Sequence, residues 1–181
     1  SRRGGDSGAG GQTDAKGGSN GLDIDYATAW SYGWEELPNL MIPNFNGGSS
    51  AGQLGADSQT WKVLKNGGVQ NVREICRSLP LYWGPQPFTA GPMYMGAVTI
   101  FLFLLGLFPL KDKEKWWLLT ATVLAICLAL GSHFMAFTRP AFRLLPLYNK
   151  FRTVSMALTV LQFTLPLLGF ITLDRIVKDG V

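Results

Sequence analysis

The segment Ser132–Arg152, SHFMAFTRPAFRLLPLYNKFR, lies between two apolar runs that are long enough to enter a lipid bilayer. It contains the only histidine of the chain, His133, and it mixes basic with aromatic residues. The basic residues are Arg139, Arg143, Lys150 and Arg152, and the rings belong to Phe134, Phe137, Phe142, Tyr148 and Phe151. At a membrane surface, aromatic rings sit at headgroup depth while cations reach toward phosphate. We therefore expect this loop to lie at an interface and to contact a ligand.

Three apolar runs in the second half of the chain predict membrane-spanning helices, at about residues 93–110, 116–131 and 153–173. The first run carries no charge and is rich in Phe, Leu, Ile and Gly, and a run of about 18 such residues is a transmembrane candidate. The second is shorter and begins at the pair Trp116 and Trp117, which is typical of a membrane interface. The expected fold is therefore all-α, with three spans in residues 93–181 and a loop at 132–152.

Residues 1–92 differ in composition, because they are rich in glycine and polar side chains and hold no bilayer-length apolar run. We expect two short helices there, Asp57–Asn66 with Asp57 or Ser58 as its N-cap, and Val69–Leu79, which Pro80 ends. The chain starts at SRRGG without an initiator methionine or a signal pattern, so we interpret it as an internal piece of a longer protein.

The same composition argues against several classes of function. The net charge of +4 is spread along 181 residues, so the chain lacks the clustered basic footprint of a nucleic-acid-binding protein. Two cysteines do not make a disulfide framework, and no His, Cys, Asp or Glu spacing predicts a metal site, a cofactor or a nucleophile–base pair. Counting Lys and Arg in the short loops gives five on one side of the membrane and four on the other, which leaves the orientation open.

Within the loop, the order of the residues predicts an anion-binding site. Thr138 can cap a short helix with Pro140 in its first turn, which would place Arg139 and Arg143 on one face. Two more cations, Lys150 and Arg152, stand where the third span begins, and tyrosine and asparagine precede them at positions 148 and 149. A helix start with basic side chains suits a phosphate group. The alternative is that these cations reach ordinary lipid headgroups.

Ahead of the spans, the stretch Leu22–Phe45 is rich in Trp and Tyr, with acidic residues between them. Such aromatic density favours packing against a membrane face or a sugar-sized ligand. Glu35 and Glu36 are adjacent, and neighbouring carboxylates on one element point apart, so we interpret both as solvated surface residues.

Several blocks, in this order, resemble the YfhO family of bacterial membrane proteins of the Bacteroidetes type. The blocks are WSYGWEE (Trp30–Glu36), IPNFNGG (Ile42–Gly48), LPLYWGPQPFTAGP (Leu79–Pro92), HFMAFTRP (His133–Pro140) and LYNKFRTVSM (Leu147–Met156). Members are similar to C-superfamily glycosyltransferases, polytopic proteins that move a sugar from a polyprenyl-phosphate donor to an extracytoplasmic glycan acceptor. The resemblance implies a bacterial inner membrane protein with residues 1–92 and 132–152 outside the cytoplasm.

The resemblance also assigns expected roles. Lys150 and Arg152 would stabilise charge on the lipid phosphate, with further contacts from four residues, Tyr148, Asn149, Arg139 and Arg143. The acceptor would lie against three aromatics, Trp30, Tyr32 and Trp34. The catalytic acid is expected upstream of this segment, so none is assigned here. The alternative function is a non-catalytic transporter or lipid-handling membrane subunit with the same spans.

Overall fold

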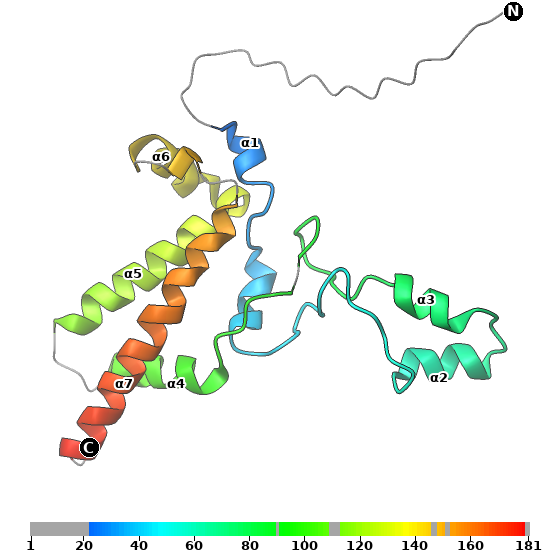
Figure 1. Cartoon of the computed structure of the whole chain (residues 1–181). Helices are drawn as coiled ribbons and strands as arrows, with labels where there is room; N and C mark the ends of the chain where they lie inside the picture. The colour runs from blue at the N-terminus through cyan, green and yellow to red at the C-terminus, as the bar shows by residue number, and fades with distance from the viewer. Residues whose placement is uncertain (1–21, 90, 109–112, 146–147, 151–152, 180–181) are drawn as a thin grey trace, which may run out of the picture.

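The computed structural model describes residues 22–89, 91–108, 113–145, 148–150 and 153–179 (Figure 1). Its helices, with 3-10 helices marked η, are α1 (Ile24–Ala27), η1 (Trp34–Leu40), α2 (Gln59–Asn66), α3 (Val72–Ser78), α4 (Ala97–Gly106), α5 (Glu114–Ala129), η2 (Gly131–Phe134), α6 (Met135–Leu144), η3 (Tyr148–Lys150), η4 (Val154–Val160) and α7 (Leu161–Asp179). These residues form no strand beyond one isolated bridge between Gly47 and Tyr82. The predicted all-α class is confirmed for them.

The longest apolar helix runs through η4 and α7, from Val154 to Lys178, and covers the predicted third span. Within its 25 residues, an 18-residue window has a mean hydropathy of 1.9. It is the one continuous helix among the described residues that is long and apolar enough to cross a membrane. Only 39% of its apolar window is buried. A core helix of a soluble protein would be mostly covered, so this exposure favours membrane association.

The predicted first span contains a much shorter helix, α4, of ten residues. At 1.5 Å per residue α4 is about 15 Å long, roughly half the thickness of a hydrocarbon core. It begins late because the Met95 N–H donates to the carbonyl of Leu40 at 2.9 Å, and Gly96 then takes a positive φ of 97°. Three spans are therefore not confirmed.

The predicted second span corresponds to α5, which has 16 residues and is followed by a sharp change of direction. The helical segments Lys115–Ala129 and Gly131–Leu144 meet at 110°. Gly131 allows this bend because its φ is +44°, a backbone conformation that residues with a Cβ rarely adopt. Together the two segments form either a broken span or a re-entrant element, and α6 is not a continuation of α5 along one axis (Figure 1).

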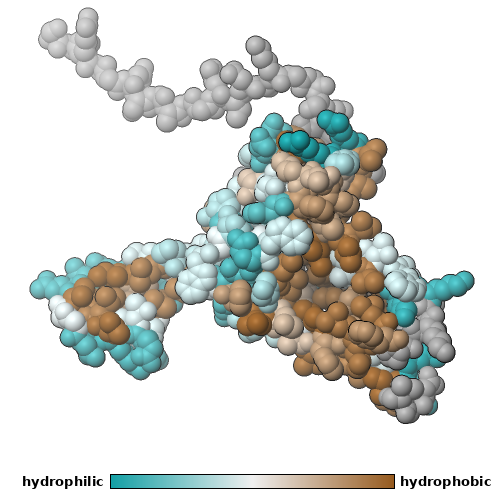
Figure 2. All heavy atoms as spheres, turned by 180° about the vertical axis from the view of Figure 1, so that it is seen from behind, coloured by the Kyte–Doolittle hydropathy of each residue, from teal (hydrophilic) through white to brown (hydrophobic). Residues whose placement is uncertain are grey.

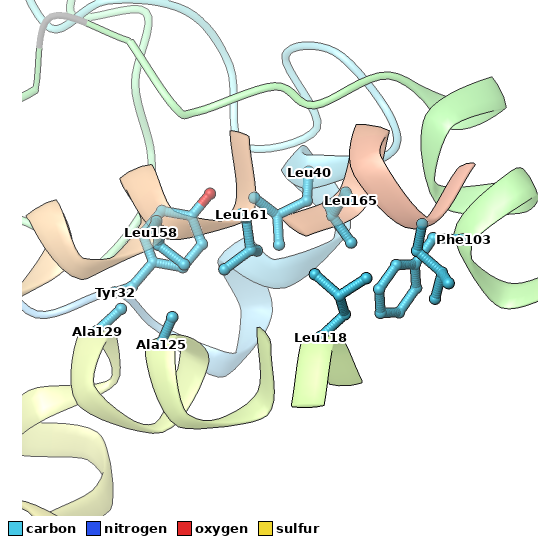
Figure 3. Close-up of a cluster of buried hydrophobic side chains, with 10 residues drawn as sticks. Tyr32, Leu40, Phe103, Leu118, Ala125, Ala129, Leu158, Leu161 and Leu165 are labelled. Atoms are coloured by element: carbon cyan, nitrogen blue, oxygen red, sulfur yellow. The ribbon is translucent and has the colours of Figure 1, made fainter. Parts of the chain in front are cut away.

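The hydrophobic core lies where η1, α4, α5 and the η4–α7 helix meet (Figure 3). It contains Tyr32, Leu40, Phe103, Leu118, Ala125, Ala129, Leu158, Leu161, Leu165 and Leu168. Small residues allow close helix contact: a Cβ at Gly169 would meet the Leu102 side chain at 3.3 Å, and Gly106 packs directly on Thr172. Because Tyr32 and Leu40 belong to the first half of the chain, the core also holds residues 32–40 against the apolar helices.

Large apolar side chains cover the outer surface of α4, α5 and α7 (Figure 2). They include Val98, Phe101, Leu104, Phe108, Val123, Leu124, Phe163, Phe170 and Val177, all exposed. A continuous apolar surface of this kind is unfavourable in water and is typical of a membrane-facing or partner-facing region. Together with the long helix it indicates membrane association.

In the first half, α2 ends where the sequence predicts, at Asn66, and begins within two residues of the prediction. Its N-cap is Ser58, whose hydroxyl accepts the Trp61 N–H at 3.2 Å. The following helix, α3, begins at Val72 and not at Val69, because Asn71 has a left-handed φ of 61°.

Candidate functional site

The carboxyl-terminal end of α5 is where the first half of the chain and the central loop come together. Its last carbonyls have no partner within the helix and need one from outside. The Tyr32 N–H donates to the Ala129 carbonyl at 2.8 Å, and the Tyr148 hydroxyl donates to the Leu128 carbonyl at 3.0 Å. Two segments that are more than 100 residues apart in the sequence therefore donate hydrogen bonds to the carbonyls at the same helix end.

The position of Thr138 corrects one prediction about this loop. Helix α6 begins at Met135, so Thr138 lies inside its first turn and does not cap it. The Thr138 hydroxyl is buried and donates to the Gly131 carbonyl at 2.7 Å. It thereby stabilises the bend between α5 and α6.

Next to this junction lies an apolar groove of about 220 Å³. It is lined by Leu128, Tyr148, Thr153, Val154, Met156 and Ala157. Burial raises the pKa of Tyr148 to about 12, so its hydroxyl stays protonated at neutral pH and keeps its bond to the α5 carbonyl. The ring of Tyr148 forms part of the groove wall while its hydroxyl is already occupied by the protein.

Of the expected phosphate-binding residues, Lys150 is exposed at the end of η3. In the chain it lies between Tyr148 and Thr153, two residues that line the groove. Arg152 and the Asn149 side chain fall outside the part of the chain that the structure describes.

The other two expected cations, Arg139 and Arg143, are both exposed on α6. They are four residues apart, so they share one side of that helix. The predicted common face is thus present, although the helix begins earlier than expected.

The three aromatics expected to form an acceptor surface lie in different surroundings. Tyr32 is buried in the core, and Trp30 packs edge-on against Phe88 with ring centroids 5.3 Å apart. Trp34 is exposed, and its indole N–H donates to the His133 carbonyl at 3.3 Å. Because Tyr32 is buried, the three side chains are not all open to an acceptor.

Trp34 instead belongs to an aromatic row on the loop side. It packs edge-on against Phe134 at 6.1 Å between centroids, and Phe134 stacks on Phe137 at 5.9 Å. This row fixes α6 against the start of η1 and leaves Trp34 facing outward beside the loop.

The prediction that Glu36 is a solvated surface residue is wrong. Glu35 is exposed, but Glu36 is fully buried. Its carboxylate accepts hydrogen bonds from the Gly33 N–H at 2.8 Å, the Tyr82 hydroxyl at 2.5 Å and the Gln86 amide at 3.0 Å. A buried carboxylate is tolerated when its oxygens are bonded in this way. Tyr82 and Gln86 lie about 50 residues downstream, so no local pattern could reveal them.

The network continues through two asparagines. The Asn39 amide donates to the Asn46 side-chain oxygen at 2.7 Å, and the Asn46 N–H returns a bond to the Asn39 side-chain oxygen at 3.0 Å. Burial, followed by the hydrogen bond to Glu36, raises the pKa of Tyr82, so that hydroxyl remains a donor. Because every oxygen of Glu36 is engaged and the side chain has no exposed area, this cluster holds the loop segments together and is not open to a substrate.

Comparisons with models of known protein families, with curated proteins and with solved structures find no match for this chain. Across the described residues, no three His, Cys, Asp or Glu side chains come together as a metal site. The strongest candidate site is the groove that Tyr148 of η3 lines. The exposed cations of α6 and η3 lie between its lining residues in the sequence.

Proposed function

We propose that this chain is part of a membrane-embedded glycosyltransferase that uses a polyprenyl-phosphate-linked sugar donor. The acceptor would be an extracytoplasmic glycan or envelope polymer. One observation carries the proposal: Tyr148, which lines an apolar groove, stands two residues before the exposed Lys150 of the loop. The lining residues of the groove flank Lys150 on both sides in the sequence. A lipid phosphate needs both features, since its isoprenoid chain prefers apolar walls and its phosphate prefers cations.

In the proposed reaction, an acceptor hydroxyl attacks the anomeric carbon and the polyprenyl phosphate leaves. Negative charge grows on the phosphate oxygen as the bond to the sugar breaks. Lys150 and Arg152 would stabilise that charge electrostatically, with Arg152 as the residue able to bind two oxygens at once. Arg139 and Arg143 would attract the headgroup from α6. The acid–base residue is assigned to another part of the protein.

The proposed topology places residues 1–92 and 132–152 on the extracytoplasmic face of a bacterial inner membrane. The helix from Val154 to Lys178, which is long and apolar enough to cross a bilayer, would be one span. α4 and the bent pair α5–α6 would complete a multi-pass arrangement around it. In support, α4 packs on α7 through Gly106 and Gly169, which allow the close backbone approach common between membrane helices.

Substitution of the two cations tests the proposed chemistry. In the full-length protein, Lys150→Ala and Arg152→Ala should abolish glycan modification while leaving membrane insertion intact. Lys178→Ala is a matched control, because Lys178 is a basic residue at the other end of α7, where it pairs with Asp174 at 2.8 Å. Normal glycan levels in both loop variants would contradict the proposal.

A second experiment tests the groove itself. Ala157→Phe should fill it and weaken binding of polyprenyl phosphate to the protein in nanodiscs. Val160→Phe places the same ring on the same helix, η4, at an exposed position outside the groove. Equal binding by both variants would count against the groove. Binding that depends on the groove, without any sugar transfer by the full protein, would favour the lipid-handling alternative.

A further inference from the structure

The two short helices α2 and α3 form a hairpin that stands away from the apolar helices (Figure 1). Both views show the hairpin to one side, on the side away from the C-terminal end of α7 (Figures 1 and 2). The Leu54 N–H donates to the Cys76 carbonyl at 3.2 Å and attaches the hairpin to its preceding loop.

The hairpin buries very little of its own apolar surface. Across α2 and α3 only Cys76 is buried. Val63 is 68% exposed and Val69 is 40% exposed, while Leu64 and Ile75 are half-buried. Helices of eight and seven residues are marginal in water without packing, so this pair requires a covering surface. Figure 2 shows the uncovered apolar strip, which is rimmed by hydrophilic side chains.

The charges around this strip indicate what covers it. Four basic side chains are exposed on the hairpin, Lys62, Lys65, Arg73 and Arg77, against one exposed acid within the helices, Glu74. An apolar strip flanked by Lys and Arg is the arrangement of elements that lie in a membrane interface, where apolar groups enter the acyl boundary and cations remain with the phosphates.

The connection to the membrane helices has the same character. The segment between α3 and α4 exposes Trp83 and Tyr94, residues of the type that collect at headgroup depth. The segment that joins the basic hairpin to the apolar helix α4 therefore also has a composition typical of a membrane interface.

We propose that the α2–α3 hairpin is a membrane-surface anchor that binds anionic lipid headgroups. Its apolar strip faces the bilayer, and Lys62, Lys65, Arg73 and Arg77 contact lipid phosphates. This role is independent of sugar transfer, since it concerns bulk anionic lipid and not the groove beside η3.

Hydrogen exchange of the full chain in nanodiscs tests the proposal. In phosphatidylglycerol nanodiscs the amides of α2 and α3 should exchange more slowly than in phosphatidylcholine nanodiscs, on the order of fivefold for each cation that contacts the surface. The double variant K62Q/K65Q should lose much of this difference, and K62Q/K65Q/R73Q/R77Q should abolish it.

The matched control is R175Q/K178Q. It removes two positive charges, as K62Q/K65Q does, but from the C-terminal half of α7. It should retain the slow exchange of α2 and α3 in phosphatidylglycerol. Equal exchange in the two lipids, protection that persists in the four-fold variant, or an equal loss in the control would each overturn the proposal. Fast exchange of α2 and α3 in both lipids would leave the strip to a protein partner that the nanodiscs do not contain.

Discussion

Two polar regions of this protein differ in how they use their polar side chains. Around η1, the Glu36 carboxylate is fully buried and bonded to Gly33, Tyr82 and Gln86. Along α6 and η3, the cations Arg139, Arg143 and Lys150 are exposed.

The difference shows that an acidic or basic residue in the sequence does not reveal its role. A charge that is satisfied inside the protein contributes to stability, and it is costly to remove because its partners stay buried. A charge that is exposed at the surface is available to a ligand and contributes little to folding. Substitution should therefore lower stability in the first region and should leave stability nearly unchanged in the second.

The largest expected effect belongs to Glu36→Ala. Removing the carboxylate takes the partner from two buried donors, the Gly33 N–H and the Tyr82 hydroxyl, and from the half-buried Gln86 amide. This should lower the free energy of unfolding by about 3 kcal/mol. Thermal unfolding in detergent or nanodiscs measures this change. Glu35→Ala, at the exposed neighbouring position, should stay within about 0.5 kcal/mol of the parent protein. Similar losses in both variants would contradict the contrast.

The next effect tests the bend at Gly131, between α5 and α6. Gly131→Ala forces a Cβ onto Ser31 and Val154 at a position with φ of +44°, and should cost about 2 kcal/mol or more in the same unfolding assay. Gly68 also has a positive φ, 72°, but a Cβ added there would meet no atom within 4 Å. Gly68→Ala therefore measures backbone strain alone, which should cost about 1 kcal/mol. Equal costs would show that the close approach at Gly131 is unimportant.

Tyr148, whose hydroxyl bonds η3 to α5, should give a pH-dependent effect of intermediate size. Its pKa is about 12 in the folded protein and about 10 when unfolded, so the folded state holds the proton more tightly. Stability should be unaffected below about pH 10 and should fall as the pH rises toward 12, by at most about 1.4 kcal/mol per pH unit for this group.

Tyr148→Phe should reduce that slope and cost about 1 kcal/mol at neutral pH through loss of the bond to Leu128. Some slope should remain, because burial also raises the pKa of Tyr32 and Tyr82. Denaturation curves at several pH values check this, and identical slopes in the two proteins would refute the assignment to Tyr148.

The smallest effect on stability is expected at Arg139 and Arg143. Both are exposed on α6, so Arg139→Gln and Arg143→Gln should each change the free energy of unfolding by less than about 0.5 kcal/mol. A loss above 1 kcal/mol in either variant would place these cations with Glu36 among the structural charges.

Much of the local structure could be predicted from the sequence. The N-cap at Ser58, the end of α2 and the apolar helix over residues 153–173 follow from side-chain type and spacing. The expected helix lengths were less accurate. α4 is shorter than its apolar run because Met95 bonds to Leu40, a contact with a distant segment that composition does not record.

By itself, the sequence determined the helical class, the short polar helices and the apolar character of the last ninety residues, because these depend on each residue and its near neighbours. Only the tertiary structure decided that Glu36 is buried while Glu35 is exposed, and that the chain turns at Gly131. Both outcomes depend on partners distant in the chain. Tyr82 and Gln86 reach Glu36, and Ser31 and Val154 close around Gly131. Desolvation and close packing act between segments that only folding brings together.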